Sequence, residues 1–316
     1  MRYCGGAAEV PPVECPKHAP LMTPQPFAER VRSALSAFGD TGSATIAAPS
    51  AELQCSEVAR ATPIYLIGDS QTLIFRDRVY RVDDGRHARH YVARAKYCPG
   101  LCASTFTGDD GALHPDVWAA LHSELLIVDG EAGEPTAFHA TADRQWREIG
   151  AVEGRRRASP IVVFLCGSLD VAKIGQALAD EAATVRDPSS LEALVAVKGQ
   201  IRAFERGLRL VKSWGLDRLF VHSVVPPQAD DETLFSHFLF RMSLRTRTRL
   251  LREINHALEA AAGRANCTFI DTWPYTMDAE VLSPEYVHDS FHFNERGALI
   301  SIKVLMRALA ALEPAP

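Results

Sequence analysis

Long hydrophobic runs are missing from this 316-residue sequence, and none reaches the roughly 18 apolar residues that a membrane-spanning helix needs. The beginning, MRYCGGAAEVPPVECPKHAP, lacks the basic segment and the apolar segment that together mark a secretory signal. Positive charge is not in excess either, because the net charge is −5 and the pI is near 6.1. The sequence therefore predicts a cytoplasmic protein that binds neither nucleic acid nor membranes.

Cysteine pairs with the spacing of metal or redox motifs are also missing. The seven cysteines are an odd number, and some lie in apolar stretches such as VVFLCGSLD, which favours reduced, packed thiols over a disulfide framework. Cys4, Cys15 and His18 lie near one another in the sequence, but no CxxC pair and no evident fourth ligand accompany them. Cys98 and Cys102 have the wrong spacing for a thioredoxin-type motif. We expect no metal and no cofactor.

The composition is that of an ordinary globular enzyme, with 47% hydrophobic and 23% charged residues. Residues 1 to about 25 are rich in proline, glycine and alanine and show no periodicity. The next segment, 26–38, has Phe27, Val31, Leu35 and Phe38 at helical spacing. Residues 1–60 are therefore predicted to form an N-terminal extension with one amphipathic helix, in front of a main domain over 61–316.

Apolar segments that alternate with helical patterns make up most of the main domain. A helix is predicted over 187–215, with Asp187 as its N-cap and Gly215 as its stop, and another over 244–264 with one apolar face. Such alternation predicts an α/β fold with three layers, in which helices cover both faces of a parallel sheet. The strands are expected at 62–69, 88–97, 159–167, 217–225 and 267–273.

A long insertion is predicted at about 103–158, between the second and third of these strands. A helix at 115–123 is expected within it, and the rest is expected to form a rim or lid over the strand ends. Arg144, Trp146 and Arg147 could contact an anionic or sugar-like substrate there, although a solvated loop is the favoured interpretation.

The tripeptide Gly68-Asp69-Ser70 ends the first strand. Ligands of open α/β sheets bind outside the carboxyl ends of the strands, so a hydroxyl at this point is well placed for chemistry. Gly68 permits a sharp turn, and Ser70 begins the next helical segment. A serine at a helix start is by itself more often a cap than a nucleophile. The hypothesis of a nucleophile therefore needs partner residues elsewhere in the chain.

Such partners occur near the end of the chain, in YVHDSFHFNERGAL. Asp289 and His292 are spaced so that, in a turn before a helix, the carboxylate can reach the imidazole nitrogen that faces away from the serine. A serine hydroxyl is a weak nucleophile at neutral pH and needs a neutral histidine to accept its proton. His288 is a competing candidate for this base, and a solvated polar loop is the simpler alternative for both residues.

Four blocks in this order resemble the SGNH, or GDSL-like, hydrolase superfamily over roughly residues 61–312. They are the Gly-Asp-Ser block, a glycine at Gly100, Gly167-Ser-Leu-Asp170, and Asp289-x-x-His292. The resemblance implies a flavodoxin-like five-stranded parallel sheet. It also implies that Ser70 is the nucleophile, His292 the general base and Asp289 its partner, with the backbone N–H groups of Ser70 and Gly100 in the oxyanion hole.

The third block departs from the family, because Leu169 stands where an asparagine normally donates to the oxyanion. The sequence has only three asparagines, Asn255, Asn266 and Asn294, and none is a natural replacement. Side chains of Ser168 or Gln71 could contribute instead. The substrate-binding candidates are Gln71, Gly167, Leu169 and Asp170. Gly167 and Asp170 could equally hold the shape of their loop, and Gln71 could be an exposed polar residue.

These patterns predict a serine hydrolase or acyltransferase that works through an acyl-Ser70 intermediate. Its expected partner is a small-molecule acyl ester or an acylated sugar, and the patterns do not distinguish water from another acceptor. The alternative, which the missing asparagine permits, is a binding or scaffold protein that keeps the fold with weakened catalysis.

Overall fold

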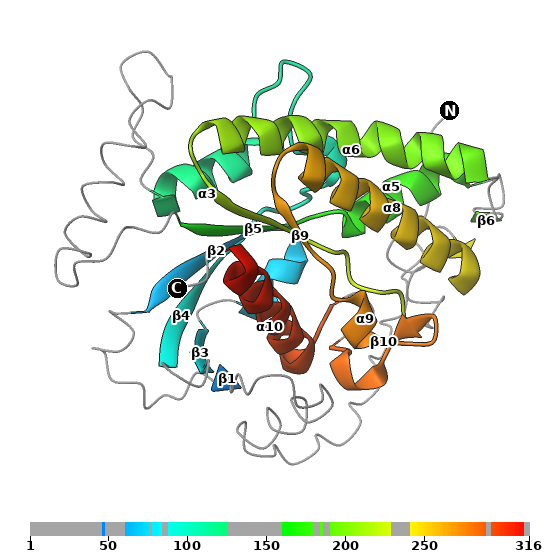
Figure 1. Ribbon diagram of the computed structural model, residues 1–316. Helices are drawn as coiled ribbons and strands as arrows, with labels where there is room; N and C mark the ends of the chain where they lie inside the picture. Colours follow the sequence, from blue (N-terminus) through cyan, green and yellow to red (C-terminus); the bar gives the residue numbers. More distant parts are fainter. Residues whose placement is uncertain are drawn as a thin grey trace, which may run out of the picture.

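A central sheet organises the described part of the chain (Figure 1). The computed structural model describes residues 46–47, 61–75, 78–83, 88–125, 160–179, 184–185, 190–228, 241–288 and 292–312. Within these residues the sheet has seven strands, in the order β1-β3-β4-β2-β5-β7-β9. They are β1 (Ile46–Ala47), β2 (Thr62–Gly68), β3 (Val79–Asp83), β4 (Ala88–Tyr97), β5 (Ile161–Leu165), β7 (Arg218–His222) and β9 (Thr268–Ile270).

The five predicted strands are β2, β4, β5, β7 and β9, and they pair in parallel. Their order across the sheet is 2-1-3-4-5 in chain numbering, which is the flavodoxin-like order. The predicted parallel sheet is thus confirmed, and β1 and β3 extend it as antiparallel strands that the sequence did not reveal. The reason is that β3, with the sequence VYRVD, is short and lacks a continuous apolar run.

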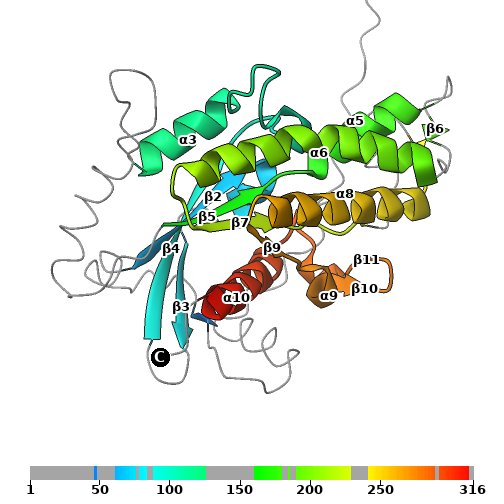
Figure 2. The same ribbon diagram turned by 45° about the horizontal axis from the view of Figure 1, so that its top comes forward.

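Helices cover both faces of the sheet (Figure 2). One face packs against α3 (Pro115–Leu125), α5 (Ser168–Leu178), α6 (Ser190–Ser213) and α8 (Leu244–Arg264). The other packs against α10 (Glu295–Leu312) and Phe75 of the 3₁₀ helix η1 (Ser70–Phe75). Alternation along β2 sends Tyr65 and Ile67 into the first core and Ile64 and Leu66 into the second. The three-layer α/β/α fold is therefore confirmed.

Small elements complete the described fold. They are η2 (Ala103–Thr105), α9 (Trp273–Thr276), η4 (Pro284–Tyr286) and the short strand pairs β6 (Thr184–Val185) with β8 (Arg241–Met242) and β10 (Met277–Asp278) with β11 (Val281–Leu282). Over the ranges that the structure describes, no helix combines the length and the apolar character needed to cross a membrane.

The predicted helices within the described residues are present. The 115–123 helix is α3, and the predicted apolar face of α8 is buried. At the end of α6, Gly215 has a left-handed φ of 83°, as its predicted role as a stop requires. Asp187, the helix over 26–38, the side chains of Arg144, Trp146 and Arg147, and the Cys4, Cys15 and His18 group lie outside the described residues. The boundary of the extension at residue 60 stays a prediction.

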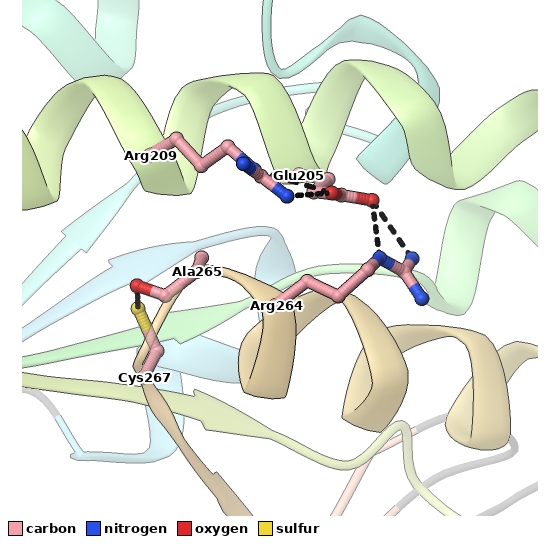
Figure 3. Close-up of polar contacts among 5 residues, drawn as sticks. All are labelled: Glu205, Arg209, Arg264, Ala265 and Cys267. Carbon is pink, nitrogen blue, oxygen red and sulfur yellow. Dashed lines mark hydrogen bonds and ion pairs between the residues drawn. The ribbon is translucent and has the colours of Figure 1, made fainter.

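An ion-pair cluster joins α6 to α8 on the outer surface of the helical layer (Figure 3). Glu205 of α6 accepts hydrogen bonds from Arg209, one turn further along, at 2.8 Å and from Arg264 at the end of α8 at 2.7 Å. The hydrogen bond from Arg264 is the main cause of a lowered Glu205 pKa. Solvent-exposed pairs of this kind contribute about 0–1 kcal/mol each, so packing of the apolar faces dominates the α6–α8 contact.

Candidate active site

The turn at Ser70 follows from the close approach of β2 to β5. A Cβ atom at Gly68 would overlap the carbonyl oxygen of Leu165, so only glycine fits at this strand end. The N–H of Asp69 then donates to that carbonyl oxygen at 2.9 Å, and η1 begins at Ser70. The hydroxyl of Ser70 is thereby held at the carboxyl edge of the sheet, half-buried.

Asp69 organises the turn with its own backbone and side chain. Its Oδ1 accepts the N–H of Gln71 at 2.9 Å, and its carbonyl oxygen accepts the N–H and the hydroxyl of Thr72 at 3.0 and 2.9 Å. The side chain is only 1% exposed, and this burial raises the pKa of Asp69 to about 7 against the opposing hydrogen bond from Gln71. No role was predicted for Asp69, although its carboxyl group between the glycine and the serine was a signal that the sequence contains.

His292 meets Ser70 across 222 residues of sequence. Its Nε2 lies 2.6 Å from the Ser70 Oγ. If the hydroxyl donates this hydrogen bond, Nε2 is the unprotonated nitrogen, which is the form that a general base requires. The side chain of His288 is exposed, and the backbone N–H of His288 donates to the carbonyl oxygen of His292 at 3.0 Å. Asp289 lies outside the described residues.

The predicted block around Gly100 forms a turn beside the end of β2. The N–H of Cys98 donates to the carbonyl oxygen of Gly68 at 2.7 Å, and Gly100 adopts a left-handed φ of 71°. Neither the backbone N–H of Ser70 nor that of Gly100 donates a hydrogen bond to any described residue. Both donors are therefore available for an oxyanion, as an oxyanion hole requires.

The third block separates into residues with different surroundings. Gly167 is buried with a φ of 117°, and a Cβ there would come within 2.7 Å of Val224. Asp170 is fully buried, and its oxygens accept the N–H groups of Ala103 and Ser104 at 2.7 and 3.0 Å. These contacts are those of loop-shaping residues, and the role of Gly167 and Asp170 in substrate binding stays a prediction. Leu169 is half-buried in the first turn of α5.

The chain matches a known protein family over the segment that begins at Gly100. A model described as the GDSL-like lipase/acylhydrolase family matches residues 100–300, more than half of the chain. The chain belongs to this GDSL-like family. The matched range includes Gly100, Asp170 and His292 and begins after Ser70.

Solved structures with low sequence identity also resemble the chain. A GDSL-like lipase from Bacteroides thetaiotaomicron has 14% identity, with 90% of this chain and 98% of that chain covered and a TM-score of 0.40. A lipolytic G-D-S-L family member from Veillonella parvula has 15% identity, coverage of 79% and 99%, and a TM-score of 0.37. A carbohydrate acetylesterase from Sinorhizobium meliloti has 13% identity, coverage of 80% and 100%, and a TM-score of 0.36. No curated protein matches the chain.

The three asparagines of this GDSL-like protein all have backbone roles. The Oδ1 of Asn255 accepts the N–H of Val224 at 2.9 Å, and that of Asn294 accepts the N–H groups of Arg296 and Gly297 and thus caps α10. Asn266 takes a left-handed φ of 54° in the turn before β9. The expectation that no asparagine replaces the amide missing at position 169 stays a prediction.

A buried histidine that was not singled out from the sequence lies beside the candidate site of this GDSL-like protein, where it lines the same small cavity as Gln71. His222 lies at the end of β7, with Nδ1 2.6 Å from the carbonyl oxygen of Ser223 and Nε2 2.8 Å from the hydroxyl of Ser301 in α10. Burial lowers the pKa of His222 to about 4, so the ring is neutral near pH 7. With Phe293 and Gln71, it lines a small cavity of about 10 Å³. Gln71 is thus buried rather than exposed.

The buried thiols in the described part of this GDSL-like protein are weaker candidates for a nucleophile than Ser70. Cys98, Cys102 and Cys166 are buried and free. Burial raises the pKa of Cys98 to about 12 and that of Cys102 to about 11, and it raises the pKa of Cys166 strongly. The thiols therefore stay protonated near neutral pH, whereas Ser70 has a base within hydrogen-bond distance.

Proposed function

We propose that the protein is a serine-dependent esterase or acyltransferase of small-molecule acyl esters or acylated sugars. The 2.6 Å contact between Ser70 Oγ and His292 Nε2 carries this proposal. Membership of the GDSL-like lipase/acylhydrolase family supports the general class of hydrolase. We keep Asp289 in the role of partner to His292, which would hold the proton of that histidine on Nδ1.

In the proposed first half-reaction, the Ser70 oxygen attacks the carbonyl carbon of the ester while its proton passes to Nε2 of His292. The negative charge that forms on the carbonyl oxygen is received by the N–H groups of Ser70 and Gly100. The tetrahedral intermediate then expels the alcohol oxygen, which takes the proton from the imidazolium. This leaves an acyl-Ser70 ester and a neutral histidine.

In the second half-reaction, water or another hydroxyl or amine gives its proton to His292 and attacks the acyl group. Collapse of that intermediate returns the proton to Ser70 and releases the carboxylic acid or the transferred acyl product. Water and acceptor compete for the same intermediate, so the reaction class depends on which of them reaches it. Release of acid and formation of acylated acceptor are the two products to measure.

A fluorophosphonate probe tests the proposal, because it labels only activated nucleophiles. The wild type should be labelled and Ser70→Ala should not, because the probe reacts with the Ser70 hydroxyl. A panel of p-nitrophenyl esters and acetylated sugars, with and without an added acceptor, would then define the substrate. A folded but unlabelled wild type would favour the binding or scaffold alternative, which Leu169 keeps open. The cytoplasmic location stays a prediction.

A further inference from the structure

A buried carboxylate connects the start of α5 to the turn that contains Gly100. The Asp170 side chain is 0% exposed, and its Oδ2 and Oδ1 accept the N–H groups of Ala103 and Ser104 at 2.7 and 3.0 Å. These amides belong to η2, more than sixty residues earlier in the sequence. Two charge-assisted hydrogen bonds to consecutive backbone amides fix the position of η2 more tightly than a single contact would.

The surroundings of this carboxylate show that its burial is costly. Burial is the main cause that raises the pKa of Asp170, and the hydrogen bonds from Ala103 and Ser104 oppose it. Lys173, one turn further along α5, lies 3.2 Å from the hydroxyl of Ser104 and also favours the ionised form. The ionised form of the buried Asp170 therefore depends on the hydrogen bonds that the two backbone N–H groups donate to it.

Gly100 lies between two fixed points. On one side, the N–H of Cys98 donates to the carbonyl oxygen of Gly68 at the end of β2. On the other, Asp170 holds Ala103, three residues after Gly100. The left-handed conformation of Gly100 and the direction of its N–H are therefore set by a short segment that is fastened at both ends.

We propose that Asp170 is a positioning residue for transition-state stabilisation, because it keeps the Gly100 N–H aimed at the charge that develops on the substrate carbonyl oxygen. This rests on the proposed function, in which Ser70 forms the new bond. Because Leu169 replaces the asparagine that donates to the oxyanion in the family, the backbone N–H groups must supply more of the stabilisation. The effect of Asp170 on the reaction rate should therefore be larger than in a protein that has this asparagine. Alignment of the backbone donors then determines the rate.

The test is Asp170→Asn, whose amide keeps one acceptor oxygen but turns an NH₂ group toward the second backbone donor. Loss of one oxyanion donor lowers kcat by roughly 10²–10³-fold, so misalignment of that donor should lower kcat by roughly 10- to 100-fold with little change in KM. The measurement compares a p-nitrophenyl ester with its thionoester, in which sulfur replaces the carbonyl oxygen. Sulfur accepts hydrogen bonds weakly, so the thionoester reaction depends less on the donors.

The expected result is that Asp170→Asn slows the oxygen ester much more than the thionoester. The matched control is Thr107→Val, which removes the hydrogen bond from the buried Thr107 hydroxyl to the carbonyl oxygen of Ala203 at 2.9 Å. Thr107 fastens the same segment to α6, further from Gly100, so its variant should lose stability while the ratio of the two rates stays that of the wild type. Equal slowing of both esters by Asp170→Asn would overturn the proposal.

A second variant covers the case in which Asp170→Asn does not fold. Lys173→Met removes the hydrogen bond to Ser104 and the positive charge near Asp170, and it should lower the ratio of the oxygen-ester rate to the thionoester rate about twofold. If Lys173→Met leaves the ratio unchanged while Asp170→Asn is unfolded or slows both esters equally, Asp170 is only structural. Failure of the proposed function is recognised separately, because the wild type would then hydrolyse neither ester or Ser70→Ala would retain the activity.

Discussion

Two carboxylates connect helices to neighbouring segments in this protein, and they do so in opposite environments. Glu205 lies on the outer surface of the α6–α8 layer, where two arginines bind it and the hydrogen bond from Arg264 lowers its pKa (Figure 3). Asp170 lies at the carboxyl edge of the sheet, where burial raises its pKa and two backbone N–H groups bind it.

The difference indicates what each region requires. On the outer face, long side chains can move together and water can replace either partner, so the pairs fix no backbone atom. At the sheet edge, the buried Asp170 carboxylate binds two backbone N–H groups. Because water cannot replace a lost hydrogen bond there, loss of one should shift the backbone that carries it. Backbone atoms are therefore held most firmly at the sheet edge, where the proposed reaction takes place. If so, substitutions at the edge should change activity more than substitutions on the outer face.

The largest expected effect is on activity at the edge. Ser70→Ala and His292→Ala should each lower kcat on a p-nitrophenyl ester at least about a thousandfold, and the double variant should be little slower than either single one, because the two residues act as a unit. Thermal unfolding should confirm that all three variants are folded. Losses that add up in the double variant would count against the assignment of nucleophile and base.

The next effect is on the pH dependence of stability at Asp69. Its pKa is about 7 in the folded protein and about 4 in an unfolded chain, so ionisation of this group disfavours folding. The protonated Asp69 carboxyl therefore contributes fully to the free energy of unfolding below about pH 4, and this contribution is lost as the pH rises through about 7. Asp69→Asn keeps an acceptor for the Gln71 N–H but does not ionise.

Urea unfolding at about pH 5 and about pH 8 checks this expectation. The free energy of unfolding of the wild type should decrease between these pH values by up to a few kcal/mol more than that of Asp69→Asn. An identical dependence in both proteins would show that Asp69 does not titrate in this range.

A smaller effect is expected at Leu169. Leu169→Asn adds an amide in the first turn of α5, and a well-aimed amide should raise kcat for a small ester by up to about a hundredfold. Loss of the half-buried leucine should at the same time cost about 1 kcal/mol of stability or of binding of a longer acyl substrate. Paired kinetics on a short p-nitrophenyl ester and a thermal unfolding curve measure both. No change in either would mean that the side chain lies outside the oxyanion hole.

The smallest effect is expected on the outer face. Glu205→Gln should lower the free energy of unfolding by about 0.2–1 kcal/mol and leave kcat unchanged. Because the pKa of Glu205 is lowered in the folded state, its contribution is present above about pH 4 and is lost on acidification. Urea unfolding at neutral and acid pH, at low and high salt, measures this. A stability loss as large as that of Asp170→Asn would remove the contrast between the two regions.

Local sequence determined most of the fold. The parallel strands and the helices α3, α6 and α8 were predictable because apolar runs and helical periodicity depend only on residues near one another in the chain. The strand β3 was not, since its five residues carry no distinctive pattern. The pairing of Ser70 with His292 was predicted from the resemblance of the spaced blocks to a hydrolase family. Hydrophobic periodicity could not predict it, because periodicity describes only residues near one another in the chain.

The alternating strands and helices, and the strand end at which Ser70 stands, could therefore be predicted from residues that are neighbours in the chain. Three features arise only when the chain folds: the contact of His292 Nε2 with Ser70, the hydrogen bonds of Asp170 with Ala103 and Ser104, and the burial of a neutral His222. They could not be predicted because these contacts join groups far apart in the chain. Strand order and helix packing bring such groups together, and their burial, which shifts their pKa values, exists only after the layers have packed.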